Sequence, residues 1–239
     1  MAARDPSVSS PGAWSYAGVT GPDHWADLSA AFAACRDGQQ QSPIDIRSVQ
    51  PIPHEPLQFS YRTQTLDAVN DGRGVQVRSP RGSTLRVRGE DFGLTAFHFH
   101  TPGETLINGA AAAAEVHLVH RSTDGRDAVV VVPIQAGPHI NHTLARIVER
   151  LPLQPGERVR YREVGVNPLL LLPPDQGYYA YTGSLGNPPC SEPVDWYILA
   201  QPVELAPEQL RRLARATGTN NVRPVQPLKG RSVFASFPR

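Results

Sequence analysis

Apolar and polar residues alternate with a period of two through several short segments of the chain. That alternation places successive side chains on opposite faces of a β-strand, so one face can be buried while the other meets solvent. In two further stretches, apolar residues recur with the period of a helix and form a stripe along one side. The sequence therefore predicts strands at 57–61, 74–78, 84–88, 96–100, 115–120, 128–134 and 195–199, and helices at 142–151 and 206–215.

Glycine and proline interrupt these segments often. The chain has 239 residues, of which 24 are proline and 20 are glycine. Such frequent breaks suit many short strands and loops better than a bundle of long helices. The alanine run 110–114 comes directly before a predicted strand and is expected to be an edge segment or a loop. The length allows one large domain or two small ones, and single all-β domains reach this size.

The charge is nearly balanced, with 23 basic and 22 acidic residues and a formal net charge of +1. Neither nucleic acid nor an anionic membrane surface is indicated as a partner, while small neutral or anionic substrates stay open. No run of about 18 apolar residues predicts a membrane-spanning helix. Residues 1–12 lack the apolar core of a signal peptide, and we expect them to be a flexible leader.

Three histidines occur where a strand pattern brings them together. His98 and His100 share one face of a predicted strand, and Phe97 and Phe99 share the other. His117 belongs to the next predicted strand, and turn-forming residues between the two let the chain return alongside. Three imidazoles without a nearby cysteine point to an open, catalytic zinc site rather than a closed, structural one. The alternative is a half-buried strand in which histidine and phenylalanine simply alternate.

Glu115 stands two residues before His117 and on the same strand face. Its carboxylate can accept the distal N–H of that imidazole, which would orient the ring and raise its basicity. The alternative is an ordinary exposed strand glutamate. His120 falls on the opposite face and is expected to be a structural, hydrogen-bonded histidine.

The two cysteines, Cys35 and Cys190, are far apart in the sequence. Their residue types alone leave three possibilities open, namely two buried thiols, a disulfide, or separate metal ligands. A disulfide would close a very long loop, which the chain-entropy model values at roughly 4–5 kcal/mol. It would also indicate an oxidising compartment.

Seven short motifs, spread over nearly the whole chain, resemble the α-class carbonic anhydrases in order and spacing. The motifs are Trp14-Ser15-Tyr16, Gly21-Pro22-Asp23-His24-Trp25, Gln41-Ser42-Pro43-Ile44-Asp45-Ile46, Phe97-His98-Phe99-His100, Glu115-Val116-His117-Leu118-Val119-His120, Tyr181-Thr182-Gly183-Ser184-Leu185 and Asn221-Val222-Arg223-Pro224-Val225-Gln226-Pro227-Leu228. The resemblance implies a mainly β (α+β) fold. A single catalytic domain at 13–239 would surround a large, twisted, mostly antiparallel sheet with a few peripheral helices.

The resemblance also implies a reaction. Zn²⁺ on His98, His100 and His117 would lower the pKa of its bound water to roughly 7, which makes hydroxide available for the reversible hydration of carbon dioxide to bicarbonate and a proton. Asn221 would lie beside these ligands. By the same resemblance, the apolar wall against which carbon dioxide rests would consist of Val119, Val129, Leu185, Val194 and Trp196.

The resemblance favours one of the three possibilities for the two cysteines, a disulfide. Cys35 and Cys190 match positions that are disulfide-bonded in secreted and periplasmic members of the family. This favours an exported location, although the absence of a visible signal peptide keeps the cytoplasm open. The sequence leaves monomer and homodimer undecided.

Four positions depart from the family pattern. Gly186 and Asn187 replace two threonines, the first of which links the zinc-bound oxygen to a buried glutamate, here Glu104. Arg73 occupies the position of a histidine that commonly carries protons, and arginine stays protonated. Ala96 replaces a glutamine that supports the ligand matching His98. These changes predict a carbonic anhydrase of reduced efficiency. The alternative is a zinc-binding, catalytically weak member that serves as a binding or assembly module.

Overall fold

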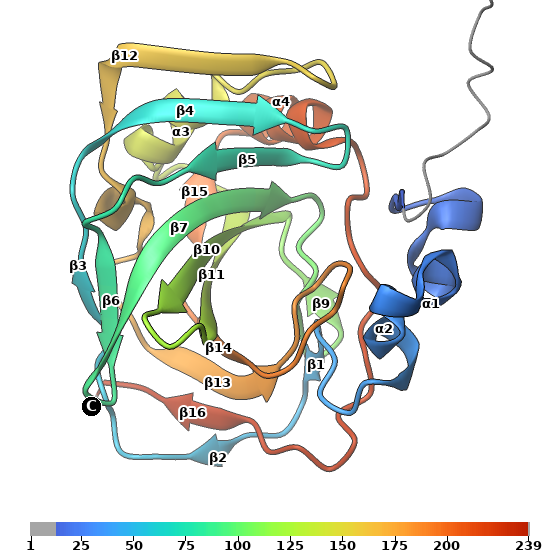
Figure 1. Cartoon of the computed structure of the whole chain (residues 1–239). Coiled ribbons are helices and arrows are strands. Elements are labelled where there is room, and N and C mark those ends of the chain that lie inside the picture. Colours follow the sequence, from blue (N-terminus) through green and yellow to red (C-terminus); the bar gives the residue numbers. More distant parts are fainter. Residues whose placement is uncertain (1–12, 239) are drawn as a thin grey trace, which may run out of the picture.

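The computed structural model describes residues 13–238 of the chain, and strands are its main regular elements (Figure 1). The expected leader 1–12 lies outside the described residues. The strands are β1 (Asp45–Ile46), β2 (Gln50–Pro51), β3 (Gln58–Ser60), β4 (Gln64–Asn70), β5 (Val75–Arg78), β6 (Thr84–Val87), β7 (Glu90–His100), β8 (Leu106–Ile107), β9 (Ala110–Ala111), β10 (Ala114–Ser122), β11 (Asp127–Ala136), β12 (Arg158–Val166), β13 (Tyr178–Gly183), β14 (Val194–Leu199), β15 (Val203–Leu205) and β16 (Phe234–Ser236). The helices are α1 (Trp25–Leu28), α2 (Ala34–Asp37), α3 (His142–Val148) and α4 (Pro207–Thr217), with short 3₁₀ turns at Gly18–Thr20, Pro22–His24, Ala30–Phe32 and Pro168–Leu171.

One large twisted sheet runs through the molecule in the order β12-β4-β5-β7-β10-β11-β14-β13-β16-β2. Its long central strands, β7 and β10, are antiparallel, and their register sets His98 directly opposite His117. Most neighbours in the sheet are antiparallel, as expected, but β11 pairs in parallel with β14. The sheet is therefore mixed near its centre.

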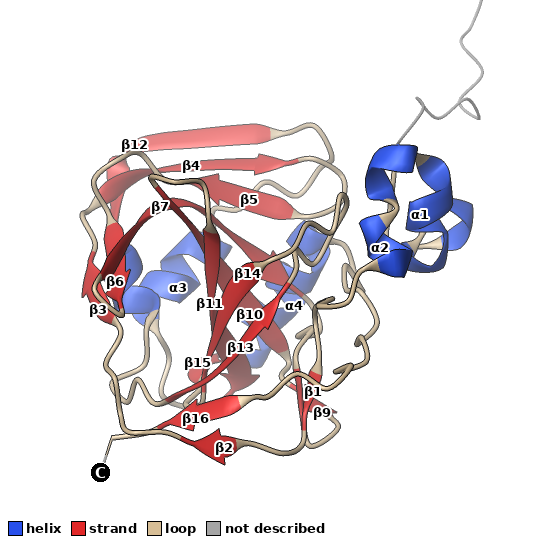
Figure 2. Ribbon diagram, turned by 60° about the horizontal axis from the view of Figure 1, so that its bottom comes forward, coloured by secondary structure: helices blue, strands red, loops and turns tan. Residues whose placement is uncertain are grey.

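One face of the sheet packs against α3 and α4 (Figure 2). Phe97 and Phe99 point to this side and join a buried cluster with Leu144 and Ile147 of α3 and Leu213 of α4. Each of these side chains is removed from water, and full burial of one large apolar side chain contributes roughly 1.5–3 kcal/mol. Because strand side chains alternate, this packing turns the histidines of β7 to the other face.

The predicted elements are all present, with shifted ends. The helix expected at 142–151 ends at Val148, and the one expected at 206–215 runs from Pro207 to Thr217. Pro207 supplies a fixed φ at the helix start, where no intrahelical N–H bond is needed. The alanine run forms the short strand β9 and the start of β10. Within residues 13–238, no helix is both long and apolar enough to cross a membrane.

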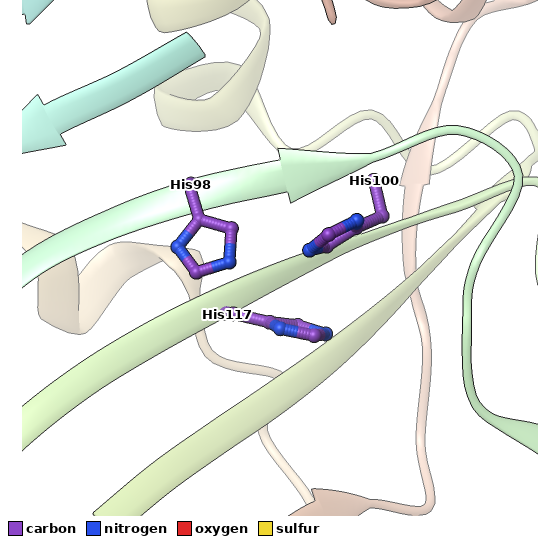
Figure 3. A group of neighbouring side chains, drawn as sticks. All are labelled: His98, His100 and His117. Carbon is purple, nitrogen blue, oxygen red and sulfur yellow. The ribbon is translucent and has the colours of Figure 1, made fainter. Parts of the chain in front are cut away.

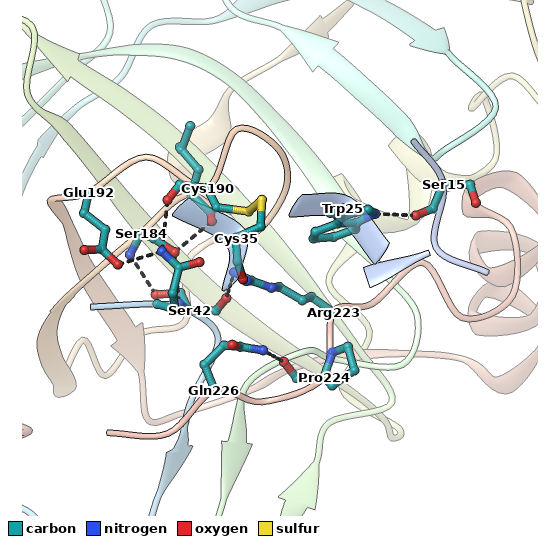
Figure 4. Close-up of a disulfide and its surroundings, with 12 residues drawn as sticks. Ser15, Trp25, Cys35, Ser42, Ser184, Cys190, Glu192, Arg223, Pro224 and Gln226 are labelled. Atoms are coloured by element: carbon teal, nitrogen blue, oxygen red, sulfur yellow. Dashed lines mark hydrogen bonds between the residues drawn. A yellow bond between two sulfur atoms is a disulfide. The ribbon is translucent and has the colours of Figure 1, made fainter. Parts of the chain in front are cut away.

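A disulfide joins the N-terminal helical segment to the rest of the molecule (Figure 4). It connects Cys35 of α2 with Cys190, with an S–S distance of 2.07 Å and a sequence separation of 155 residues. Beside it, the buried Arg223 guanidinium donates to the carbonyl oxygens of Cys35 (2.7 Å) and Ser42 (2.8 Å). The helical segment is thus held by the disulfide and one charge-assisted hydrogen bond, and the second bond of Arg223 fixes the chain that follows it.

Candidate metal centre

Three imidazole rings converge on the face of β7 and β10 that is turned away from α3 and α4 (Figure 3). The ring centroids of His98 and His100 lie 5.0 Å apart, those of His98 and His117 5.1 Å, and those of His100 and His117 4.5 Å. One nitrogen from each ring lies within 4.8 Å of the other two. The strand register brings together the three side chains that the sequence places on one face.

Two of the rings are fixed by hydrogen bonds from the nitrogen that faces away from the group. His100 Nδ1–H donates to the carbonyl oxygen of Asn221 at 2.6 Å, and His117 Nε2–H donates to Glu115 Oε1 at 2.6 Å. These bonds leave Nε2 of His100 and Nδ1 of His117 free to accept. A hydrogen bond of this kind selects the tautomer and sets the orientation of a metal-binding imidazole.

The donor set suits zinc. Burial lowers the pKa of His100 well below its ordinary value, and the neighbouring His117 and His98 add to that effect. The ring is therefore neutral at pH 7, which is the form that binds a metal. A second group, of Glu104, Glu115 and His117, also lies within reach of one ion. It is fully buried, and its Glu115–His117 contact is already a hydrogen bond, so the three histidines are the better metal site.

A cavity of about 400 Å³ leads to the histidines and is lined by Tyr16, Gln76, His98, His100 and Val119, among others. A smaller chamber of about 40 Å³ continues past them, and Val119, Val129, Leu185 and Trp196 line it. Four of the five side chains expected to form an apolar wall therefore surround this chamber. The fifth, Val194, is buried in the same apolar cluster but is not among the residues lining either space.

Glu104 and Gly186 meet in the smaller chamber. Glu104 Oε1 accepts the backbone N–H of Arg223 at 2.8 Å, whereas Oε2 is buried and has no hydrogen-bond partner within the described residues. Burial raises the pKa of this carboxyl well above its ordinary value, and the nearby Glu115 raises it further. A Cβ added to Gly186 would lie 3.2 Å from Oε2. The missing side chain therefore leaves its space directly beside an unpaired carboxylate oxygen.

Neither Arg73 nor Ala96 supports an imidazole of the histidine group. Arg73 lines the outer part of the cavity, where its guanidinium sits 4.4 Å from the Trp14 ring and pairs with Asp71 at 2.6 Å. Ala96 is buried opposite Val119. Within residues 13–238, the His98 ring makes no hydrogen bond, so it lacks the support that His100 and His117 have.

Several side chains near the site have contacts that the sequence did not predict. Tyr16 lines both spaces, and so does Asn187. Gln76 of β5 faces His98 across the strand pair. Asn221 acts on His100 through its backbone carbonyl, while its side chain bridges Thr101 N–H (3.0 Å) and Phe99 O (2.9 Å). The resemblance had already placed Asn187 and Asn221 at the site, and Gln76 alternates with buried valines, whereas Tyr16 had been given no role there.

His120 lies on the opposite face, as expected. Its Nε2 is 2.6 Å from the hydroxyl of Tyr61, and both side chains are buried. It takes no part in the histidine group.

Comparison with known proteins gives consistent results. Residues 20–237 match a family model described as eukaryotic-type carbonic anhydrase. A carbonic anhydrase from a Nostoc species is 37% identical over 229 residues, covering 94% of this chain and 86% of the relative. An α-carbonic anhydrase from Thermovibrio ammonificans, solved with sulfanilamide, has a TM-score of 0.89 and 37% identity, covering 93% of this chain and 99% of that one. Dioscorin DB3L from Dioscorea polystachya is 31% identical over 92% of this chain and 83% of its own.

Proposed function

The chain belongs to the eukaryotic-type, or α-class, carbonic anhydrase family, and from this premise we propose that it hydrates carbon dioxide reversibly to bicarbonate and a proton, with zinc as its cofactor and at reduced efficiency. The observation that carries the proposal is the group of three imidazoles between an open cavity and a smaller chamber with an apolar wall. Retention of all three, with Glu115 in place, favours an enzyme over a module that only binds.

His98, His100 and His117 would hold the zinc ion through one nitrogen each. When bound in this way, zinc supplies Lewis-acid activation of a water molecule at neutral pH. Glu115 and the carbonyl of Asn221 fix the rings of His117 and His100. The metal-binding nitrogens of these two rings are therefore oriented before a metal binds. His98 has no such partner, and we expect the metal affinity to be lower than it would be with a hydrogen-bonding residue at position 96.

The apolar wall of the smaller chamber would accommodate carbon dioxide. The molecule is small and apolar, and the chamber of about 40 Å³ next to the histidines is walled by Val119, Val129, Leu185 and Trp196. An apolar wall also excludes competing ordered water, which lowers the cost of placing carbon dioxide there. On the other side, the side chain of Asn187 can donate to bicarbonate, because it lines both spaces.

Glu104 would act through a water molecule at the space beside Gly186. The unpaired Oε2 and the Gly186 backbone N–H offer that water polar partners, and the glycine leaves the room. A mobile water positions a proton less firmly than a fixed hydroxyl does. This arrangement would keep the hydration reaction working while reducing its rate.

Replacing Gly186 by threonine should accelerate carbon dioxide hydration severalfold. Gly186 lies outside the left-handed region that favours glycine, so its backbone accepts a side chain. Its Cβ would stand 3.2 Å from Glu104 Oε2, a tight contact that requires the Glu104 carboxyl to move by a few tenths of an ångström. The threonine hydroxyl would then reach Oε2 directly, and one well-placed hydrogen bond is worth roughly 0.5–1.5 kcal/mol. The measurement is the stopped-flow hydration rate per bound zinc.

Gly186→Ala is the matched control, because it adds the same Cβ without a hydroxyl. We expect no acceleration from alanine. Equal rates for the wild type and Gly186→Thr would remove the missing hydroxyl as the cause of reduced efficiency.

Within residues 13–238, no histidine outside the group of three lines the cavity, so protons have to leave without one at the rim. Arg73 is held by Asp71, and an arginine does not release its proton near neutral pH. Burial raises the pKa of Tyr16, which also lines the cavity, far above its ordinary value. Water chains or external buffer must then carry the proton. We expect a low turnover number that rises with buffer concentration, and a high turnover that ignores buffer would contradict this.

The second candidate is a zinc-binding, catalytically weak module. It is favoured by the position of the departures, since Arg73 lines the cavity, Gly186 lines the smaller chamber, and Ala96 pairs with Val119, which lines both. The likeness to a dioscorin also favours it. The two candidates differ in one measurable way, the zinc-dependent hydration rate.

For the location, the disulfide fits an extracytoplasmic compartment, and we propose that the protein is secreted or periplasmic.

A further inference from the structure

The turn between β7 and β8 packs directly against the carboxylate of Glu115. Residues 101–105 form this turn. Gly103 N–H donates to the carbonyl oxygen of Ala112 at 3.0 Å, which fixes the turn to the chain between β9 and β10. A Cβ added to Gly103 would lie only 3.1 Å from Glu115 Oε2. The glycine therefore lets the turn approach this oxygen closely.

The Glu115 carboxylate is buried and has few hydrogen-bond donors. Its Oε1 accepts Nε2–H of His117 at 2.6 Å, and its Oε2 accepts the backbone N–H of Thr105 at 3.3 Å, which is long for a bond of this type. Among residues 13–238, no other hydrogen bond reaches this carboxylate, although an ionised one can accept about four. Glu115 is only 1% exposed, so bulk water does not supply the missing donors, and a buried charge without them is costly.

Thr105 carries a hydroxyl that can supply one more donor. Its Oγ1 is buried and has no hydrogen-bond partner within the described part of the chain. The two other buried side-chain atoms without a partner there are Gln41 Oε1 and Glu104 Oε2, which belong to an amide and a carboxylate. Thr105 thus holds the only hydroxyl among these unpaired atoms, and a buried hydroxyl without a partner is itself destabilising.

Covalent geometry keeps this hydroxyl close to Glu115. Oγ1 and the backbone nitrogen of one threonine are joined through Cα and Cβ, and the Thr105 nitrogen already lies 3.3 Å from Oε2. Rotation about the Cα–Cβ bond moves Oγ1 among staggered positions. A change of rotamer can therefore turn the hydroxyl to the carboxylate, so that O–H and N–H of the same residue both donate to it.

We propose that Thr105 is a positioning residue of the histidine group, and that its hydroxyl and backbone N–H together hold the Glu115 carboxylate beside His117. The idea rests on the proposed zinc-dependent function. A carboxylate that is held firmly keeps its short bond to the imidazole, which selects the tautomer with Nδ1 free and raises the basicity of that nitrogen. Thr105 strengthens metal binding in this way without touching the metal or the substrate.

The test compares Thr105→Val, which replaces the hydroxyl with a methyl group of similar size, with Thr105→Ser, which keeps the hydroxyl. In metal-free protein, NMR follows the imidazole N–H protons of His117 and His100, because a strongly hydrogen-bonded N–H resonates at unusually low field. We expect Thr105→Val to move the His117 signal to higher field. The His100 signal should stay in place, since that ring donates to the carbonyl of Asn221 instead. Thr105→Ser should preserve both signals.

Zinc affinity, measured by competition with a chelator, gives the second readout. Loss of one hydrogen bond to Glu115 should weaken zinc binding roughly three- to tenfold in Thr105→Val, whereas Thr105→Ser should stay within about twofold of the wild type. An unmoved His117 signal or an unchanged affinity in Thr105→Val would overturn the inference and leave the proposed function intact. Equal movement of the His117 and His100 signals would also overturn it, because that result indicates a general loosening of the site.

The wild-type protein decides the matter if Thr105→Val does not fold. A crystal structure of the wild type should place Thr105 Oγ1 within about 3.0 Å of a Glu115 oxygen, and a hydrogen bond of this hydroxyl to any other group would contradict the inference. A wild-type protein that binds no zinc would overturn the proposed function and this inference together, and that outcome is seen before any variant is compared.

Discussion

Replacing His117 by alanine should abolish zinc retention and reduce carbon dioxide hydration by more than about 100-fold, since changes in residues that merely support a ligand already cost 10–100-fold. The variant removes one of three nitrogens that lie within 4.8 Å of one another. It also leaves the buried Glu115 without the imidazole that donates to it at 2.6 Å. Zinc content after dialysis gives a readout that does not depend on activity.

The matched control for this variant is His24→Ala, which removes an exposed imidazole outside the histidine group. It should keep both zinc and hydration. If His117→Ala retained one zinc per chain with the affinity of the wild type, the metal site would have to lie elsewhere.

Removing the disulfide should cause the second large effect. A double variant with Cys35→Ser and Cys190→Ser frees a loop defined by a sequence separation of 155 residues. The chain-entropy model values a closure of this size at roughly 4–5 kcal/mol. For a chain of this length, such a loss lowers the unfolding midpoint by on the order of 10 °C. Thermal unfolding with and without reductant measures it.

The same variant should also affect the site. Cys190 N–H donates to the carbonyl oxygen of Asn187 at 2.8 Å, so the bridge anchors the loop that carries Gly186 and Asn187. We expect lower hydration well below the unfolding midpoint, and no further response to reductant. An unchanged midpoint would mean that hydrogen bonds such as those of Arg223 hold this segment without the bridge.

The fold was predictable wherever one face of an element is buried. The strands around His98 and His117 alternate cleanly because the core face packs against α3 and α4. Edge strand β12 escaped prediction, since most of its residues are exposed and little apolar periodicity remains. Strand β4 was missed because its buried positions begin and end with Gln64 and Asn70. The four-residue helices α1 and α2 are too short to show a helical period.

The site was predictable where it depends only on the type of side chain and on the alternation of side chains between the two faces of a strand. Alternation places His98, His100 and His117 on one face, and the structure brings them together. The resemblance placed Asn221 beside the ligands, but nothing in the residue pattern indicated its bond to His100, because a backbone carbonyl is available at every residue and Asn221 lies 121 residues away. The unpaired oxygen of Glu104 likewise depends on three-dimensional packing beside Gly186. The assignment of zinc to the three histidines stays a prediction.

The most direct test of that prediction is stopped-flow carbon dioxide hydration by protein whose zinc content has been quantified, compared with the same protein stripped of metal. We expect a hydration rate well above background that is lost on stripping and returns when zinc is added back. A protein fully loaded with zinc that shows no rate above background would contradict the enzymatic account and would favour the binding module.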